Sequence, residues 1–190
     1  MKRIIVGITG ATGALYGISL LRQLQTLNIE THLIISPWGK KTLQYETHLT
    51  TNDLTSLVQH IHAPNDMESP LASGSFRTMG MIIVPCSVNT LAGVAQGRAD
   101  SLMLRAADVI LKERRRLVLM VRETPLNLMH IRNMETVTLA GGVITTPAPS
   151  LYTHPKHIDE MVQQTTGRLL DLFDLEVPIP RWGETLPKSK

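Results

Sequence analysis

Polar and charged side chains follow five apolar, strand-like runs of this sequence, each at the point where the run ends. In an open parallel sheet the carboxyl ends of the strands share one edge, and ligands bind there. Hydroxyl, amide and guanidinium groups at such an edge suit hydrogen bonding to a polar or anionic ligand. Caps and turns use the same residue types, so each position alone also fits a structural role. Together they predict a polar ligand site built from Thr9, Thr12, Ser36, Ser87, Asn89, Thr90, Arg122, Glu123, Ser150 and Tyr152.

The first of these strand ends is a glycine-rich turn with Gly7, Gly10 and Gly13. A strand, a glycine-rich turn and a helix N-terminus bind phosphate through backbone N–H groups and the helix dipole. The spacing is neither the dinucleotide pattern G-x-G-x-x-G nor a Walker A loop. Ser36 stands where a dinucleotide fold places an acidic residue on the ribose, which disfavours NAD and FAD. We therefore expect a mononucleotide phosphate, with a tight turn that binds nothing as the alternative.

Three other groups of residues have weaker chemical cases. His60 and His62 have metal-ligand spacing, but no third ligand is evident at a suitable spacing, so we expect surface histidines and no metal site. Cys86 has no histidine or cationic neighbour in the sequence, so we expect a packing residue. Arg105 and Asp108 lie three residues apart on a predicted helix and are expected to pair on its surface.

The elements that position these residues alternate between strand and helix patterns, which predicts a parallel sheet with right-handed crossovers. The expected fold class is α/β, a three-layer flavodoxin-like or Rossmann-like sheet with helices on both faces, in one domain over residues 1–190. A tail begins at about residue 178 and is expected to fray after Pro187. Residues 61–78 are the longest irregular piece. The expected strands cover residues 4–8, 31–35, 79–84, 117–121 and 143–146, and helices after the first cover residues 37–45, 52–60, 101–112, 127–140 and 157–173.

Composition excludes several classes of protein. Aromatic residues are only 4% of the chain and no nucleic-acid-binding signature occurs, so the net charge of +3 does not indicate nucleic-acid binding. A single cysteine rules out an intrachain disulfide and favours a reducing compartment. No apolar run approaches the ~20 residues that span a bilayer, and no signal-peptide pattern is present. We therefore expect a cytoplasmic protein without a membrane partner.

The sequence resembles the UbiX-type flavin prenyltransferase family over essentially its whole length. The motifs that carry the resemblance are VGITGATGA, the strand end at Ser36, SGSF, PCSVNTLAG, RAADVILKERRRLVLMVRETPL, HIRNM, PAPSLYTHP and the late RW. This resemblance implies a flavodoxin-like fold in a homo-oligomer, a dodecamer. It also implies reduced FMN as prenyl acceptor, dimethylallyl phosphate as donor, and prenylated FMN as a product used by a UbiD-type decarboxylase.

The resemblance also assigns residues to the two ligands. Many family members carry serine where this chain has Thr12, which retains the hydroxyl and adds a methyl group. Contacts to the donor phosphate are implied for Lys112, Glu123, Tyr152 and Arg168, some of them across a subunit interface. Contacts to FMN are implied for Gly10, Ala11, Thr12, Ser36, Ser87, Val88, Asn89, Thr90 and Arg122.

The chemistry of prenyl transfer agrees with these assignments. An allylic phosphate separates into an allyl cation and a phosphate, which Lys112, Arg168 and the hydroxyl of Tyr152 can neutralise. Glu123 can exchange the proton that ring closure requires, helped by Thr12. The catalytic set is therefore Glu123, Thr12 and Lys112. The sequence has no Asp-rich cluster of the kind that binds Mg²⁺ for a diphosphate, so no metal is expected. Aromatic faces for the cation could come from Trp38, Tyr152 or Trp182, with simple packing as the alternative for the tryptophans.

Two other functions remain open from the sequence. A flavoprotein of the cysteine decarboxylase type typically needs a histidine near the first helix and a late cysteine. This chain has no histidine between Arg3 and Glu30 and no cysteine after Cys86. A non-catalytic FMN-binding redox or carrier module would not need the combination of Lys112, Glu123, Tyr152 and Arg168. Apolar helices around Met129, Met134 and Met161 predict more apolar surface than one small domain buries, and hence an oligomer.

Overall fold

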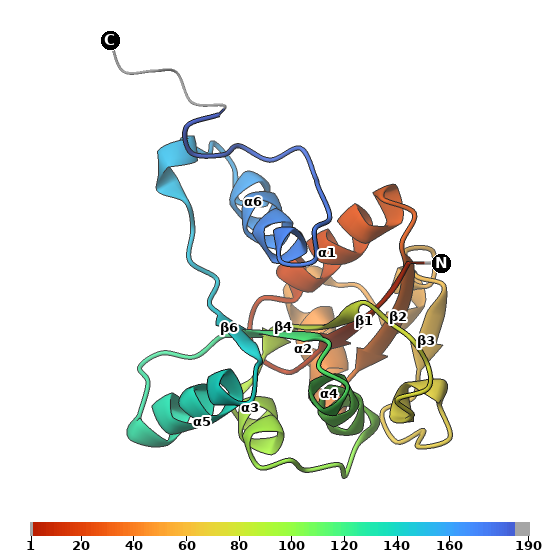
Figure 1. The fold of residues 1–190 in the computed structure, drawn as a ribbon. Coiled ribbons are helices and arrows are strands. Elements are labelled where there is room, and N and C mark those ends of the chain that lie inside the picture. The colour runs from red at the N-terminus through yellow and green to blue at the C-terminus, as the bar shows by residue number, and fades with distance from the viewer. Residues whose placement is uncertain (1, 185–190) are drawn as a thin grey trace.

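The computed structural model describes residues 2–184 as one six-stranded parallel sheet with helices on both faces (Figure 1). The strand order is β3-β2-β1-β4-β5-β6. With β3 included this is the Rossmann order, and without β3 it is the flavodoxin order. The expected fold class is therefore confirmed. The strands are β1 (Arg3–Ile8), β2 (Glu30–Ile35), β3 (His60–His62), β4 (Gly80–Cys86), β5 (Arg116–Val121) and β6 (Val143–Thr145).

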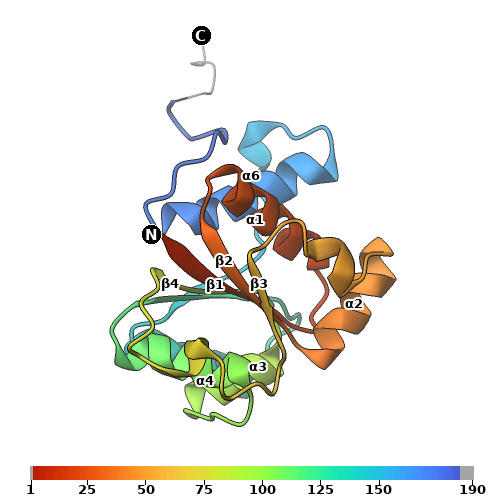
Figure 2. The ribbon, with the colours of Figure 1, turned by 90° about the vertical axis from the view of Figure 1, so that its right-hand side faces the viewer.

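The helices form a layer on each side of the sheet (Figures 1 and 2). Alternate strand residues face two separate cores, which is why the strands are apolar almost throughout. One core holds α1 and α6, and the other holds α3, α4 and α5. The helices are α1 (Ala14–Thr26), α2 (Pro37–Thr47), α3 (Val88–Ala95), α4 (Leu102–Lys112), α5 (Leu128–Leu139) and α6 (Ile158–Asp171). Leu15 on α1 and Ile158 on α6 are exposed although both are apolar.

Helix boundaries follow the local capping chemistry. Ser36, Ser101 and Asn127 are the N-caps of α2, α4 and α5, and each accepts a hydrogen bond from a backbone N–H in the first turn. Gly141, with φ of 96°, lies just after the end of α5 as the sequence predicts. The predicted ion pair between Arg105 and Asp108 is also present, at 2.8 Å.

The helix predicted over residues 52–60 is wrong. A single 3₁₀ turn, Thr51–Leu54, closes where the Asp53 carboxylate accepts hydrogen bonds from the N–H and hydroxyl of Thr50. The chain then forms β3, which pairs in parallel with β2. A strand of three residues is too short to show a period of two, so its existence depends on pairing with β2.

The long segment after β3 follows an irregular course, as expected, apart from a 3₁₀ turn at Pro70–Ala72. Two arginines fasten it to the α4 side of the sheet. Arg115 donates to the carbonyl groups of Phe76 (2.8 Å) and Gly74 (2.6 Å), and Arg105 donates to the carbonyl group of Ala72 (3.1 Å). The conformation of the segment is therefore set by distant guanidinium groups.

The chain after α6 is docked to the domain up to Arg181. Arg181 makes two hydrogen bonds of 2.7 Å to the Asp171 carboxylate, and Ile179 is buried in the α1/α6 core. The tail expected from residue 178 is thus anchored at its beginning. The fraying expected after Pro187 lies outside the described residues.

Asp171 gives this anchor a pH dependence. Hydrogen bonds from Arg181 lower the pKa of the Asp171 carboxyl from its ordinary value of 3.8; partial burial opposes this, and the charges of Arg181 and Arg168 add to it. A lowered folded-state pKa means stability that is present above the unfolded-state pKa and lost as the pH falls through the folded-state pKa. We expect Asp171→Asn to lower the Tm at pH 7.

The difference in Tm between the parent and Asp171→Asn should shrink below about pH 4, where the parent carboxylate also becomes protonated. Thermal unfolding at pH 7 and pH 3 measures it, with Asp66→Asn as a control for loss of an acidic side chain elsewhere. A Tm difference that stays constant down to pH 3 would contradict this account of the anchor.

Candidate functional site

The carboxyl ends of β1, β4 and β5 are joined by hydrogen bonds that fix the centre of the predicted site. The Thr9 hydroxyl donates to the carbonyl of Pro85 at 2.7 Å and accepts from the N–H of Ser87 at 2.8 Å. The N–H of Arg122 donates to the carbonyl of Cys86 at 3.1 Å. Thr9 is only 1% exposed, so its hydroxyl is structural. The expectation that Thr9 contacts a ligand is wrong, whereas Thr12 is exposed on the turn.

The N-terminus of α1 holds a carboxylate of the chain itself. The N–H groups of Gly13 and Ala14 donate to the Glu46 carboxylate at 3.0 and 2.8 Å. These are N–H groups that the glycine-rich turn was expected to offer to a phosphate, and the helix dipole favours the carboxylate for the same reason. Sequence reasoning missed Glu46 because it lies on α2, more than thirty residues from the turn.

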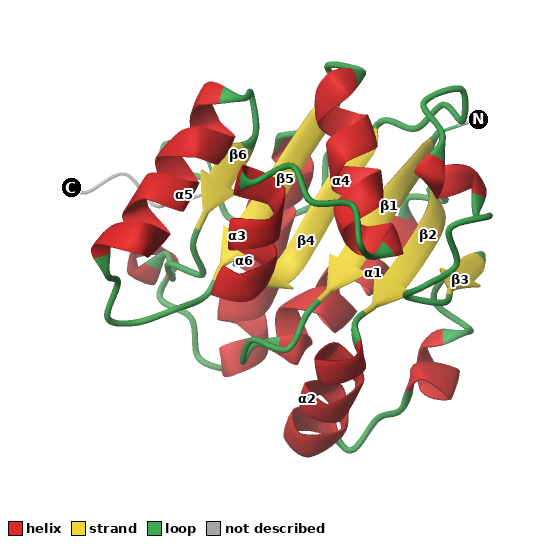
Figure 3. Cartoon of the chain, turned by 90° about the horizontal axis from the view of Figure 1, so that it is seen from below, coloured by secondary structure: helices red, strands yellow, loops and turns green. Residues whose placement is uncertain are grey.

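Packing against α2 also requires glycine at position 10, which the glycine-rich motif alone does not show. A Cβ at this position would lie 2.5 Å from the Cβ of Trp38. The carbonyl of Gly10 also accepts a hydrogen bond of 3.2 Å from the hydroxyl of Thr42. The turn and α2 therefore approach each other closely, and Figure 3 shows α2 beyond the arrowheads of β1 and β2.

A polar pocket of about 270 Å³ lies where the N-termini of α2, α3 and α4 converge. Ser36, Asn89 and Thr90, all predicted to contact FMN, line it together with Ser101. The N-caps Ser36, Ser87 and Ser101 each hold one N–H of the helix that follows. Three helix N-termini around one polar pocket suit a phosphate. The structure thus brings together predicted residues that are fifty positions apart.

A larger apolar groove of about 510 Å³ lies elsewhere, between α1 and α6. Leu15, Ile18, Val162 and Ile179 are among its lining residues. None of the strand-end polar residues lines it. A larger volume therefore does not mark the place of the chemistry, because a phosphorylated ligand needs the donors that converge at the strand ends.

The residues predicted to hold the donor phosphate are not brought together within one chain. Lys112 is the last residue of α4, at the opposite end of this helix from the polar pocket, and its ammonium pairs with Glu113 at 2.6 Å. Arg168 on α6 pairs with Asp171. Within residues 2–184, no hydrogen bond or ion pair joins any two of Lys112, Glu123, Tyr152 and Arg168.

Glu123 and Tyr152 are both accessible. The exposed Glu123 carboxylate accepts a hydrogen bond of 3.0 Å from the N–H of Thr124. The segment 147–157 runs from β6 away from the sheet to α6 (Figure 1), and there Tyr152 meets Trp182 edge to face at 5.1 Å. Trp38 is 67% exposed beneath the ammonium of Lys41, so neither tryptophan is packed in the core.

Comparison with known proteins decides among the flavoprotein classes. Residues 1–170 match the family described as Flavoprotein. Flavin prenyltransferase UbiX of Thauera aromatica is 49% identical over 181 residues, covering 95% of this chain and 93% of that protein. The chain belongs to the UbiX-type flavin prenyltransferase family. This confirms the resemblance expected from the motifs.

Two solved structures of UbiX-type proteins have the same fold as this chain. A crystal structure of AnUbiX in complex with FMN and dimethylallyl pyrophosphate superposes with a TM-score of 0.94 at 50% identity, covering 96% of this chain and 97% of that one. The dodecameric FMN-dependent UbiX-like decarboxylase of Escherichia coli O157:H7 gives 0.93 at 47% identity, covering 95% and 98%.

This UbiX-type chain exposes apolar side chains on and beside α5. Leu128, Met129, Ile131 and Leu139 are all more than half exposed. Met129 was expected in such a surface, whereas Met134 and Met161 are only partly exposed. Contiguous apolar side chains on the surface mark protein interfaces. Across residues 2–184, no helix is both long enough and apolar enough to cross a lipid bilayer.

The structure also tests the expectations for Cys86, His60 and His62. Cys86 is fully buried in the core of the α3/α4 side, and burial raises the pKa of its thiol, so it is a packing residue as expected. The expectation that His60 and His62 lack a third partner is wrong. Pairing of β3 with β2 brings Glu30 and His32 to His60, and His32 is also hydrogen-bonded to His62.

Proposed function

We propose that this chain is a flavin prenyltransferase that transfers the dimethylallyl group of dimethylallyl phosphate to reduced FMN, making prenylated FMN for a UbiD-type decarboxylase. The observation that carries the proposal is the similarity over nearly the full length to UbiX proteins, one of which was solved with FMN and dimethylallyl pyrophosphate. We also propose a cytoplasmic site of action, because the single cysteine favours a reducing compartment.

The residues at the strand ends fit FMN. The pocket between the N-termini of α2, α3 and α4 offers hydroxyl groups of Ser36 and Thr90 to the phosphate. Residues 10–12 and Arg122, whose N–H is hydrogen-bonded to the carbonyl group of Cys86 on β4, would hold the rest of FMN. Bound there, reduced FMN supplies the electron-rich ring that accepts the allyl group.

The remaining residues handle charge and protons. Lys112, Arg168 and the Tyr152 hydroxyl bind the departing phosphate, and Glu123 exchanges a proton during ring closure. Because Lys112 is at the far end of α4, we propose that a neighbouring subunit supplies it. The exposed apolar residues of α5 support an assembly, and the relative from Escherichia coli is a dodecamer. We propose the same assembly for this chain.

Phosphate release tests this function against a non-catalytic FMN carrier. Protein incubated without oxygen with reduced FMN and dimethylallyl phosphate should release inorganic phosphate, about one molecule for each molecule of flavin consumed. Oxidised FMN, or reduced FMN without donor, should release none. Tight FMN binding without phosphate release would favour the carrier.

Arg168→Ala should chiefly weaken donor binding. Loss of one charge-assisted contact costs about 1.5–3 kcal/mol, or roughly ten- to a hundred-fold in the KM for the donor. Asp171 keeps its two hydrogen bonds to Arg181, so the fold should be preserved. Steady-state kinetics at saturating reduced FMN measure the effect, with Arg22→Ala as the matched loss of an exposed arginine. An unchanged KM with reduced kcat would contradict a role in donor binding.

A further inference from the structure

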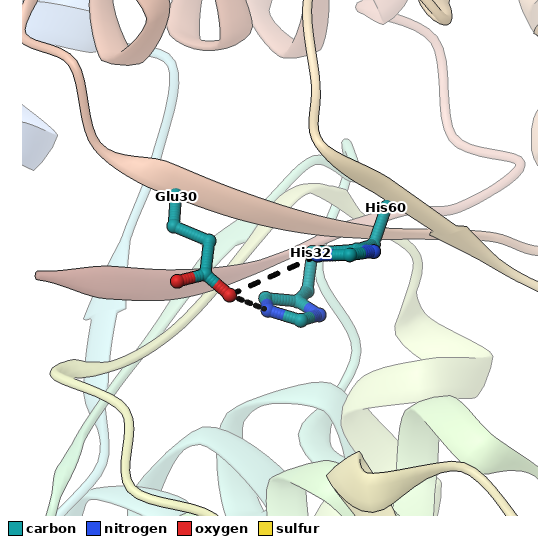
Figure 4. Close-up of side chains that lie close together, drawn as sticks. All are labelled: Glu30, His32 and His60. Atoms are coloured by element: carbon teal, nitrogen blue, oxygen red, sulfur yellow. Dashed lines mark hydrogen bonds and ion pairs between the residues drawn. The ribbon is translucent and has the colours of Figure 1, made fainter. Parts of the chain in front are cut away.

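A second cluster of chemically competent side chains lies at the edge of the sheet formed by β2 and β3. Glu30 and His32 are two residues apart on β2, so their side chains are on the same face of the sheet. His60 is the partner of His32 in the parallel pairing of β3 with β2. Figure 4 shows the carboxylate of Glu30 directed toward both imidazole rings. Glu30 and His32 lie at the start of β2, at the opposite end of that strand from Ser36.

The distances within this cluster are close to those of a metal centre. Oε1 of Glu30 lies 3.0 Å from Nε2 of His32 and 3.8 Å from Nε2 of His60. All three ligand atoms lie within 4.8 Å of one another. Ligand atoms around a tetrahedral Zn²⁺ with bonds near 2.0–2.1 Å are about 3.3 Å apart. The His60 side chain is 53% exposed, so its ring has room to move toward the other two ligands.

The surrounding hydrogen bonds hold two of the ligands in place. Oε2 of Glu30 accepts from Nε of Arg3 at 3.2 Å, and Oε1, which is hydrogen-bonded to Nε2 of His32, is the atom that would bind a metal in place of that hydrogen bond. Nδ1 of His32 lies 3.0 Å from Nε2 of His62, and Nδ1 of His62 lies 2.8 Å from Oγ of Ser69. A metal on Nε2 of His32 requires the ring proton to be on Nδ1. This Nδ1–H can then donate a hydrogen bond to Nε2 of His62. Metal-ligating histidines generally have such a partner.

The cluster is also accessible from solvent on one side. His32 is 3% exposed, whereas the side chain of His60 is 53% exposed. A hollow opens onto the site, and its lining residues are Arg3, Gln25, Asn28 and Gln59 together with Glu30 and His60. It provides an entry path and room for water as a fourth ligand. Arg3 is the nearby cation, and its guanidinium lies over the Phe76 ring, on the Oε2 side of Glu30.

We propose that Glu30, His32 and His60 form a binding site for a divalent transition metal of the Zn²⁺ class, which fastens the edge strand β3 to β2. Two imidazoles and one carboxylate favour Zn²⁺, Co²⁺, Ni²⁺ or Cu²⁺ over Mg²⁺ and Ca²⁺. The site is separate from the flavin residues and takes no part in prenyl transfer. His62 acts as a positioning residue through His32.

Titration with Zn²⁺ tests the site directly. Untagged protein treated with chelator should bind one Zn²⁺ per chain in calorimetry, and the Tm should rise with the Zn²⁺ concentration because metal binds only the folded chain. Co²⁺ should give the visible absorption of a tetrahedral complex. His60→Ala should abolish all three signals and still fold, because His60 is at the surface.

His157→Ala is the matched control, because His157 is an exposed histidine outside the cluster. It should bind Zn²⁺ as the parent does. His62→Asn should keep a weakened site, with Co²⁺ absorption at higher Co²⁺ concentration. The proposal is wrong if the parent takes up no Zn²⁺, or if His60→Ala binds Zn²⁺ as tightly as the parent. The cluster would then be a hydrogen-bonded contact between β2 and β3.

Discussion

Replacing Glu123 with glutamine should leave FMN bound but lower turnover by roughly 10²–10⁴-fold, the usual effect of losing an acid–base group. Glutamine keeps the size and the hydrogen bonding of the side chain but cannot exchange a proton. Among the described residues, the exposed Glu123 carboxylate accepts one hydrogen bond, from the N–H of its neighbour Thr124. The substitution should therefore not disturb the fold.

Stopped-flow mixing with reduced FMN and saturating donor measures the turnover of Glu123→Gln, and calorimetry measures its FMN affinity. Glu68→Gln, at an exposed glutamate in the loop after β3, is the matched control and should behave as the parent. If Glu123→Gln turned over at the parent rate, the departing phosphate would be the base. Glu123 would then be left with a structural role.

Two inactive variants should restore activity when they share one assembly. Lys112→Ala lacks the cation and Glu123→Gln lacks the acid–base group, so each alone should be nearly inactive. Lys112 is eleven residues along α4 from the N-cap at the polar pocket, or about 16 Å. If a neighbour supplies it, a mixed assembly contains sites with both parent residues.

Random mixing of equal amounts of the two variants should give about one quarter of the parent activity, because half the chains carry each parent residue. Co-expression with two different affinity tags, followed by isolation of doubly tagged assemblies, makes the measurement. Co-expression of Lys112→Ala with itself is the control. If the mixed assembly were no more active than the separate variants, Lys112 and Glu123 would have to act from the same chain.

Local chemistry made the strand-to-helix junctions predictable. Ser36 caps α2 and Asn127 caps α5, and each side chain accepts a hydrogen bond from a backbone N–H three residues later. Long apolar runs gave five of the six strands because the sheet is buried on both faces. β3 escaped prediction because three residues show no pattern, and only β2 specifies their conformation.

The site was predictable as a set of strand ends but not as a set of contacts. Thr9 and Thr12 look alike in sequence, yet only pairing of β1 with β4 shows that the Thr9 hydroxyl is used internally. Glu46 and His32 escaped notice because Ala14, the partner of Glu46, and His62, a partner of His32, are distant from them in the chain. Lys112 carries no sequence signal for the end of the sheet on which it lies.

Mass analysis of the flavin tests the central claim most directly. The protein is incubated without oxygen with reduced FMN and dimethylallyl phosphate, and the flavin is then extracted and weighed by mass spectrometry. A prenyltransferase should add one five-carbon isoprenyl unit to FMN, and the added mass should be absent with Glu123→Gln over the same short time. Recovery of unmodified FMN from parent protein that had bound both ligands would contradict the account.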